Sequence, residues 1–253
     1  MTNRAVFPVS ARGLESGVAR RSWPRLISSV VGAAAIMVAM MGPAAITAGT
    51  PAAGDVYVYR QVNGYSNEVR AQVRYRVDKL ESNRVMVTVT VDGPSAGTAY
   101  TEIYTREGNW LRHPMVNHNQ LVEYEFAAAY PAYAFPLEPG KSWSVRVNAT
   151  IPATGQLRSV RVDGTVLGNE RIRVPAGEFD TVKIRRLVYP GDWDSFLTET
   201  KVIEFDWYAP ALGRTVRTER KAEFFDLSRG RGNRLQRGDW DVFELVEAPA
   251  PKT

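Results

Sequence analysis

The sequence predicts an all-β, single-domain protein built on one curved antiparallel sheet, half-open barrel or sandwich-like in form, with little helix. Three observations lead to this prediction: side chains alternate with a period of two, turn-forming residues recur at hairpin distances, and helical spacing is hard to find. Of the 253 residues, 44% are hydrophobic, and neither Gly nor Pro is abundant enough for a fibrous or disordered chain.

Residues 1–48 are predicted to be a signal peptide. A basic segment precedes the uncharged residues 26–41, and small residues follow up to Ala48, where we expect cleavage. An uncleaved anchor is the alternative, because residues 26–48 are long enough to span a bilayer, which takes roughly 20 residues. Pro43 and the Ala/Gly richness of the segment disfavour the anchor. The basic residues before the apolar segment are Arg4, Arg12, Arg20, Arg21 and Arg25.

Most of the positive charge belongs to this targeting segment. The whole chain carries a formal net charge of +5, whereas the chain after residue 48 has 27 basic and 26 acidic residues. We therefore expect no nucleic-acid partner. An exported protein would be periplasmic or secreted, with no stable membrane span once the signal is cleaved, or tethered to the inner membrane through residues 26–48 if it is not.

The sequence contains no Cys. That absence rules out disulfides, iron–sulfur clusters, Cys-ligated zinc, a thiol nucleophile and a lipid anchor on cysteine.

Alternating rows mark the strands in order along the chain, at residues 69–77, 85–91, 143–151 and 203–207. In the last row Ile203, Phe205 and Trp207 are expected to face the core, and Glu204 and Asp206 the solvent. Turn signals between the rows indicate roughly ten to twelve strands in a meander. These signals are Asn63-Gly64, Ser82-Asn83, Asp92-Gly93-Pro94, Glu107-Gly108-Asn109, Gly168-Asn169, Pro175-Ala176-Gly177 and residues 210–213.

The predicted domain covers residues 55–247, and residues 248–253 form a disordered tail. One stretch departs from strand spacing. Residues 121–130 could form about two helical turns before Pro131 ends them.

The chain has two histidines, His113 and His118. Pro114 favours an exposed polar loop around them. A metal site would need a third ligand such as Glu123 or Glu125, and nothing in the sequence brings one there. We therefore expect no metal and no cofactor.

No catalytic residues are expected. The sequence has no Gly-x-Ser-x-Gly elbow. The acidic pairs Asp192/Asp194 and Glu204/Asp206 have the spacing of any solvated strand face, so they are predicted to be surface residues.

An arginine-rich loop at residues 228–240 offers anion-contacting candidates, namely Arg229, Arg231 and Arg234. For an exported protein the matching partners are lipid headgroups, lipopolysaccharide or a polyanionic glycan. A flexible, solvated loop is the other interpretation.

Aromatic residues are plentiful, and most are expected in the core or at the sheet rim. An aromatic-lined concave face is also what apolar-ligand carriers use, and residues 127–137 could lie across such a face as a lid. The ligand-binding candidates are Trp110, Tyr130, Tyr133 and Phe135.

Three segments occur together in a familiar order: residues 135–143 (FPLEPGKSW), 168–184 (GNERIRVPAGEFDTVKI) and 207–219 (WYAPALGRTVRTE). This order resembles a group of exported bacterial β-proteins of unknown function with the curved sheet of the lipoprotein-localisation carriers LolA and LolB. The resemblance implies a half-open barrel that could hold an acyl chain. The missing N-terminal Cys sets this chain apart from lipid-anchored LolB-like members.

The leading hypothesis is a non-enzymatic envelope protein that binds an apolar or amphipathic, lipid-like ligand in the concave face of the sheet. A structural module that docks on an envelope protein partner is the alternative. The third hypothesis is an enzyme acting on an envelope polymer through Asp192, Asp194 or Glu204.

Overall fold

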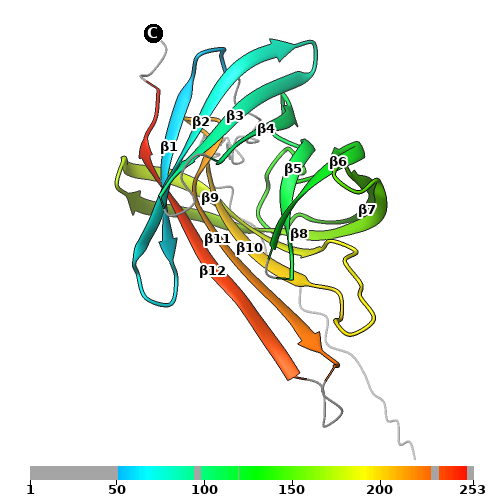
Figure 1. Cartoon of the computed structure of the whole chain (residues 1–253). Coiled ribbons are helices and arrows are strands. Elements are labelled where there is room, and N and C mark those ends of the chain that lie inside the picture. Colours follow the sequence, from blue (N-terminus) through cyan, green and yellow to red (C-terminus); the bar gives the residue numbers. More distant parts are fainter. Residues whose placement is uncertain (1–50, 94–97, 119, 229–233, 250–253) are drawn as a thin grey trace, which may run out of the picture. The chain divides into compact units, whose positions relative to one another are not determined.

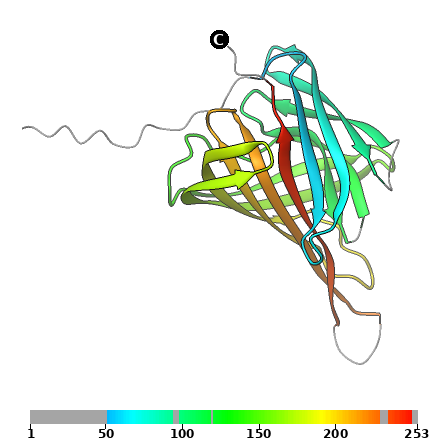
Figure 2. The ribbon, with the colours of Figure 1, turned by 90° about the vertical axis from the view of Figure 1, so that its left-hand side faces the viewer.

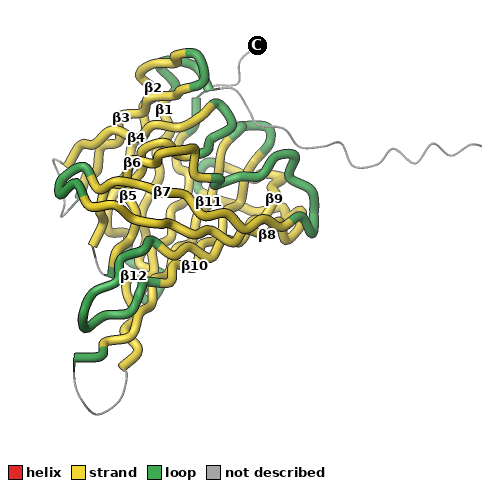
Figure 3. The backbone as a smooth tube through the Cα atoms, turned by 90° about the vertical axis from the view of Figure 1, so that its right-hand side faces the viewer, coloured by secondary structure: helices red, strands yellow, loops and turns green. Residues whose placement is uncertain are grey.

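The computed structural model describes residues 51–93, 98–118, 120–228 and 234–249. These residues form twelve antiparallel strands and no helix (Figures 1 and 3). The strands are β1 (Val56–Asn63), β2 (Val69–Glu81), β3 (Arg84–Asp92), β4 (Thr98–Thr105), β5 (Trp110–Asn117), β6 (Gln120–Tyr130), β7 (Ser142–Ile151), β8 (Gln156–Val174), β9 (Gly177–Tyr189), β10 (Lys201–Ala209), β11 (Arg214–Asp226) and β12 (Arg234–Glu247).

Each strand pairs with its neighbours in sequence, and β1 pairs with β12, so the sheet is a closed barrel. The predictions of an all-β single domain and of ten to twelve strands in a meander are confirmed. Closure is fuller than the half-open form expected, because pairing of the first and last strands removes both sheet edges. In such a meander, the turns after even-numbered strands lie at one end and the turns after odd-numbered strands at the other.

Strand β3 follows its predicted pattern: Val85, Val87 and Val89 are buried. The predicted turns at residues 175–177 and 210–213 are also confirmed, since they join β8 to β9 and β10 to β11.

Strand β10 contradicts its predicted orientation. Glu204 and Asp206 are buried and face the barrel interior, while Phe205 and Trp207 face outward. The reason lies in the β8–β9 hairpin, whose end lies across the outside of neighbouring strands (Figure 2). There Val174 and Phe179 pack in one cluster with Trp207, so both faces of β10 are covered and alternation does not distinguish inside from outside.

The helix expected at residues 121–130 is also a wrong prediction, because these residues form most of β6. Tyr124 and Phe126 alternate inward with period two, and the strand pairs with β5 at residues 120–125 and again at Tyr130. Tertiary pairing overrides the weak helical preference of three consecutive alanines.

Strands β6 and β7 pair only at Glu125–Thr150 and Phe126–Ala149. Beyond that point the connector of residues 131–141 packs its side chains against the barrel wall. Leu137 is 1% exposed and lies in one cluster with Phe135 and Trp143. The indole nitrogen of Trp143 donates to the carbonyl of Pro131 at 3.0 Å.

A second separation lies between β4 and β5, which pair only at Ile103–Arg112 and Tyr104–Trp110. The start of β4 and the end of β5 therefore make ladder contacts on one side only, with β3 and β6 respectively.

The signal peptide predicted at residues 1–48, the anchor alternative at 26–48 and most of the predicted tail lie outside the described residues. Within the described part of the chain there is no helix with the length and apolarity to cross a bilayer.

Gly164 is required by the ring of Trp143, which lies directly opposite it across β7 and β8. A Cβ at Gly164 would lie 2.1 Å from that ring. We therefore expect Gly164→Val to displace the ring and to lower the free energy of unfolding by about 1–3 kcal/mol, as overpacking does. Urea unfolding followed by tryptophan fluorescence measures this. Thr165→Val, the next residue on the same strand, is the control, and equal stability of the two variants would contradict the prediction.

Candidate functional site

The barrel encloses a cavity of about 460 Å³. Most of its lining comes from the inward faces of β1–β5 and β9–β12 and from the turns after β4 and β10, and Leu121 of β6 and Tyr133 after β6 also line it. This volume falls within the range of roughly 300–1,000 Å³ that small-molecule sites occupy.

One part of the wall is apolar and aromatic because valines and tyrosines occupy the inward positions of β1–β4, every second residue along each strand. Five valines line this part together with a set of tyrosines. The residues are Val73, Val77, Val85, Val87, Val91, Tyr57, Tyr59, Tyr75, Tyr100 and Tyr104. Such a surface suits the hydrocarbon part of a ligand.

The opposite part of the wall carries a buried ion cluster centred on Arg186 of β9. Its guanidinium lies 3.0 Å from Glu204 Oε2 and 2.7 Å from Asp206 Oδ2, and it donates to the carbonyl of Ala132 at 3.1 Å. The cross-strand register places Glu204 directly opposite Arg186. Asp206 also accepts hydrogen bonds from Tyr133 Oη at 3.0 Å and from Thr218 at 2.7 Å.

These contacts decide the charge state of the cluster. Burial by itself would lower the pKa of Arg186, but the carboxylates of Asp206 and Glu204 raise it well above its usual value. Burial raises the pKa of Tyr133, and the negative charge of Asp206 adds to that effect. Arg186 therefore stays charged and Tyr133 stays a neutral donor.

Glu102 and His113 form a second polar group in the cavity. Glu102 is fully buried on β4, and its Oε1 lies 3.2 Å from His113 Nδ1 on β5. Neither carboxylate oxygen accepts a hydrogen bond from the described residues. The ring of His113 stacks on Trp110 with centroids 3.8 Å apart. The exposed loop predicted for His113 is wrong: Pro114 is tolerated in β5 because the β4–β5 pairing has ended there.

The four predicted aromatic residues gather in one region. Trp110 and Tyr133 line the cavity, and Tyr130 stacks on Trp110 from behind, with centroids 4.7 Å apart. Phe135 packs against Tyr208 and Tyr133. Their segment forms part of β6 and of the wall beside it, rather than crossing an open concave face.

A second hollow lies at the other end of the barrel, around the turns after β5, β7, β9 and β11, and Arg234 is on its rim. Arg229 and Arg231 lie outside the described residues. The structure does not bring Arg234 together with the cavity-lining Trp110 and Tyr133.

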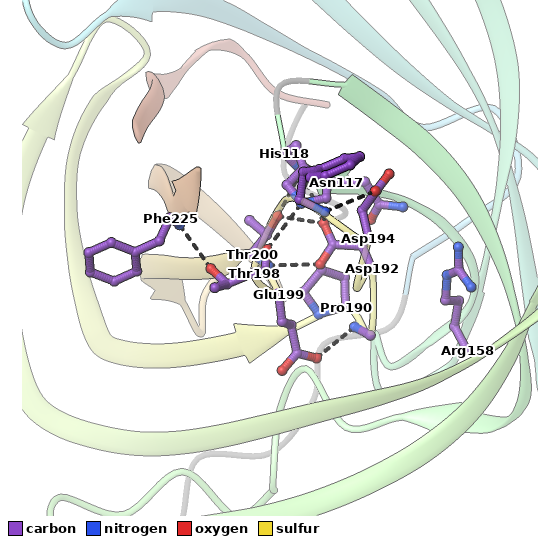
Figure 4. A network of polar contacts seen from close by, with 12 residues as sticks. Asn117, His118, Arg158, Pro190, Asp192, Asp194, Thr198, Glu199, Thr200 and Phe225 are labelled. Atoms are coloured by element: carbon purple, nitrogen blue, oxygen red, sulfur yellow. Dashed lines mark hydrogen bonds and ion pairs between the residues drawn. The ribbon is translucent and has the colours of Figure 1, made fainter. Parts of the chain in front are cut away.

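Asp192 organises this end (Figure 4). It is 4% exposed and accepts from the backbone of Thr200 at 2.8 Å and of His118 at 3.1 Å. His118 has a positive φ of 49° and its Nε2 lies 3.1 Å from the carbonyl of Thr198. The surface position predicted for Asp192 is therefore wrong, because its carboxylate ties the loop of residues 190–200 to the β5–β6 turn.

Sequence reasoning missed Glu102, Arg186 and Arg214 as cavity residues. The only available signal was a charged side chain within a row of otherwise apolar inward positions, as Glu102 between Tyr100 and Tyr104. Among the described residues, no three His, Asp or Glu side chains come together to hold a metal ion.

Fold and site together define a closed twelve-stranded antiparallel barrel around a cavity with apolar, aromatic and charged walls. No family model matches the chain, and no curated protein matches it.

Three solved structures are similar to the chain. One, from Bacteroides fragilis, is described as an exported protein with a YmcC-like fold; it matches at 14% identity with a TM-score of 0.50, covering 81% of this chain and all of that one. A protein described as a lipoprotein, from Parabacteroides distasonis, matches at 15% identity with a TM-score of 0.46, covering 80% of this chain and 99% of that one. The hypothetical lipoprotein YmcC of Escherichia coli matches at 12% identity with a TM-score of 0.41, covering 78% of this chain and 85% of that one. At these identities, the likeness to the Bacteroides fragilis structure shows the fold alone.

Replacing Arg186 tests the ion cluster. Arg186→Met would leave Glu204 and Asp206 buried without their cation, so we expect the free energy of unfolding to fall by about 3–5 kcal/mol. Chemical denaturation measures the change. Arg185→Met is the matched control, since Arg185 is the next residue on β9 and points to solvent. A loss no larger than that of the control would show that the cluster contributes little.

The buried tyrosines predict a loss of stability at high pH. Burial raises the pKa of Tyr59, Tyr75 and Tyr130 above the ordinary value of about 10. Below that pH the folded and unfolded chains hold the same phenolic protons; above it, only the unfolded chain releases them. The free energy of unfolding should therefore fall as pH rises above about 10, by up to ~1.4 kcal/mol per pH unit for each such tyrosine.

Unfolding midpoints across this pH range, with tyrosinate absorbance as the second signal, measure the effect. Tyr130→Phe should reduce the slope, and its hydroxyl makes no hydrogen bond with the described residues. Tyr65→Phe removes an exposed hydroxyl and is the control. A stability that does not change with pH above 10 would contradict the assignment.

Proposed function

We propose that the protein is an exported envelope protein that binds an amphipathic, lipid-like ligand inside its barrel without chemically altering it. The observation that carries the proposal is the cavity of about 460 Å³, which is walled by valines and tyrosines on one part and by charged groups on the other. A site with both surfaces matches a molecule that has an apolar tail and a polar end.

The separation of β4 from β5 supports this function. Glu102 of β4 and His113 and Pro114 of β5 lie along it and line the cavity. A ligand could pass there without breaking a ladder of hydrogen bonds, because few such bonds join the two strands.

The arrangement of the acids favours binding over hydrolysis. Glu204 and Asp206 both contact Arg186, so neither carboxylate is free to act as a general acid. Asp192 is held by the backbone of His118 and Thr200.

Export is supported by the predicted signal peptide, and the similar Bacteroides fragilis structure is described as an exported protein. The resemblance to exported bacterial β-proteins with a LolA- and LolB-like curved sheet supports a carrier of acyl chains.

A docking module is the second candidate, because apolar side chains are exposed together at the end of the β11–β12 hairpin. Leu227 donates its backbone N–H to Phe196, and Phe225 lies opposite Leu235; all four are at least 40% exposed. Arg234 is adjacent, so an envelope partner with an anionic, partly apolar surface would fit. A substitution that fills the cavity with a larger side chain distinguishes the two functions, because it would weaken ligand binding but leave docking on a partner intact.

Val87→Phe places a larger side chain in the cavity wall, where Val87 is 1% exposed. We expect binding of the uncharged fluorescent probe N-phenylnaphthylamine to weaken at least about tenfold, which corresponds to ~1.4 kcal/mol. Native mass spectrometry of protein purified gently from its own envelope should show a lipid-sized adduct on the wild type and less on the variant.

Thr90→Phe is the matched control, because Thr90 lies on the opposite face of β3. Should Val87→Phe fail to fold, Val85→Phe tests the same wall. Folded variants that bind the probe as tightly as the wild type would overturn the proposed function.

A further inference from the structure

The charged side chains of the cavity fall into two groups. Arg186 is paired with Glu204 and Asp206, and Arg220 with Asp241 at 3.2 Å. Arg106 and Glu107 lie in the exposed turn after β4, where water solvates them. Arg214 and Glu102 are the other two charged residues of the cavity wall. Neither forms an ion pair with an Arg, Lys, Asp or Glu among the described residues.

Arg214 is surrounded by tyrosines instead of carboxylates. Its Nε donates to Tyr59 Oη at 2.9 Å, and its guanidinium carbon lies 4.5 Å from the ring centroid of Tyr57 and 4.8 Å from that of Tyr75. Contact with ring faces offsets only part of the lost hydration of a cation. The remaining guanidinium donors favour an anionic oxygen.

Glu102 presents the opposite charge. It is fully buried, and neither of its oxygens accepts a hydrogen bond from the described residues. His113 Nδ1 lies 3.2 Å from Oε1, which leaves Oε2 without a near donor. Tyr100 and Tyr104, the inward residues on either side of Glu102 along β4, line the cavity as well. A carboxylate among aromatic rings favours a cation, an alkylammonium above all.

Tyr75 of β2 lies near both charges, although Arg214 comes from β11 and Glu102 from β4. Arg214 contacts the ring of Tyr75, and after burial the negative charge of Glu102 is the next largest cause of the raised pKa of that tyrosine. Across the sheet, Tyr75 pairs with Val89 and Val89 with Tyr100, and Glu102 is the next inward residue after Tyr100. A headgroup that lies against Tyr75 would therefore face both charges.

We propose that the ligand is an amphiphile with a zwitterionic headgroup, whose anionic group contacts Arg214 and whose cationic group contacts Glu102. This inference rests on the proposed function and specifies its ligand. The apolar tail lies against the valines of β2 and β3 that line the cavity, Val73, Val77 and Val85.

The test uses four probes with the same decyl tail, each below its critical micelle concentration: decylphosphocholine, which is zwitterionic, decyl phosphate, decyltrimethylammonium, and uncharged decyl maltoside. Isothermal titration calorimetry measures their binding to the signal-cleaved chain. We expect the wild type to bind decylphosphocholine at least about tenfold more tightly than each of the others, as one added charge-assisted contact implies.

Two variants, each of which removes one charge, assign the contacts. Arg214→Gln should bind decylphosphocholine no more tightly than decyltrimethylammonium, and Glu102→Gln no more tightly than decyl phosphate. Arg185→Gln, an outward-facing change on β9, should keep the wild-type preference. If either cavity variant fails to fold, the preference of the wild type among the four probes still shows whether the site favours a zwitterionic headgroup.

The possible outcomes distinguish a failure of the zwitterionic headgroup from a failure of the proposed ligand binding. Equal binding of all four probes, or preference for a singly charged one, would overturn the zwitterion and leave the proposed function standing. No binding of any probe, uncharged decyl maltoside included, would contradict both.

Discussion

The buried ion cluster of Arg186 with Glu204 and Asp206 is the interaction on which the rest of the barrel depends. It joins β9 to β10, and through the carbonyl of Ala132 it holds the connector between β6 and β7. Charges in this position cost free energy unless all of them are paired and hydrogen-bonded. The structure meets that condition with two carboxylates for one guanidinium, and Tyr133 and Thr218 donate to the extra negative charge.

The cavity follows from where the strands separate. The β6–β7 connector carries Tyr133 and Phe135 into the space that two fully paired strands would have closed, and Trp143 holds it through Pro131. Strands β4 and β5 separate as well, which leaves Glu102 and His113 beside a wall with few ladder bonds. A barrel of this many strands encloses more space than its inward side chains fill, so large aromatic residues and charged groups reach toward the middle. Some inward side chains of the barrel therefore pack as a core, and others line the cavity.

The sequence predicted much of the fold but little of the site. The valine row of β3 and the turns at residues 175–177 and 210–213 could be predicted because each depends on local spacing and local turn chemistry. Glu204 and Asp206 were assigned to solvent because a strand with an apolar face usually buries that face. Here the β8–β9 hairpin covers Phe205 and Trp207 from outside, and the acids face inward to Arg186. The β8–β9 hairpin packs on a strand that is distant in sequence, and a local pattern of residues cannot predict such a contact.

By itself, the sequence determined the all-β class, the period of two within the strands, the exclusion of thiol chemistry and several turns, although the turn predicted at Gly168-Asn169 lies inside β8. The tertiary structure decided which face of β10 is inside, that residues 121–130 extend as a strand, and that Arg214 and Glu102 line the same cavity. The physical reason is the range of the interactions. A period of two is set by neighbouring residues, whereas the direction of a face and the partner of a charge are set by strands that meet only when the barrel closes.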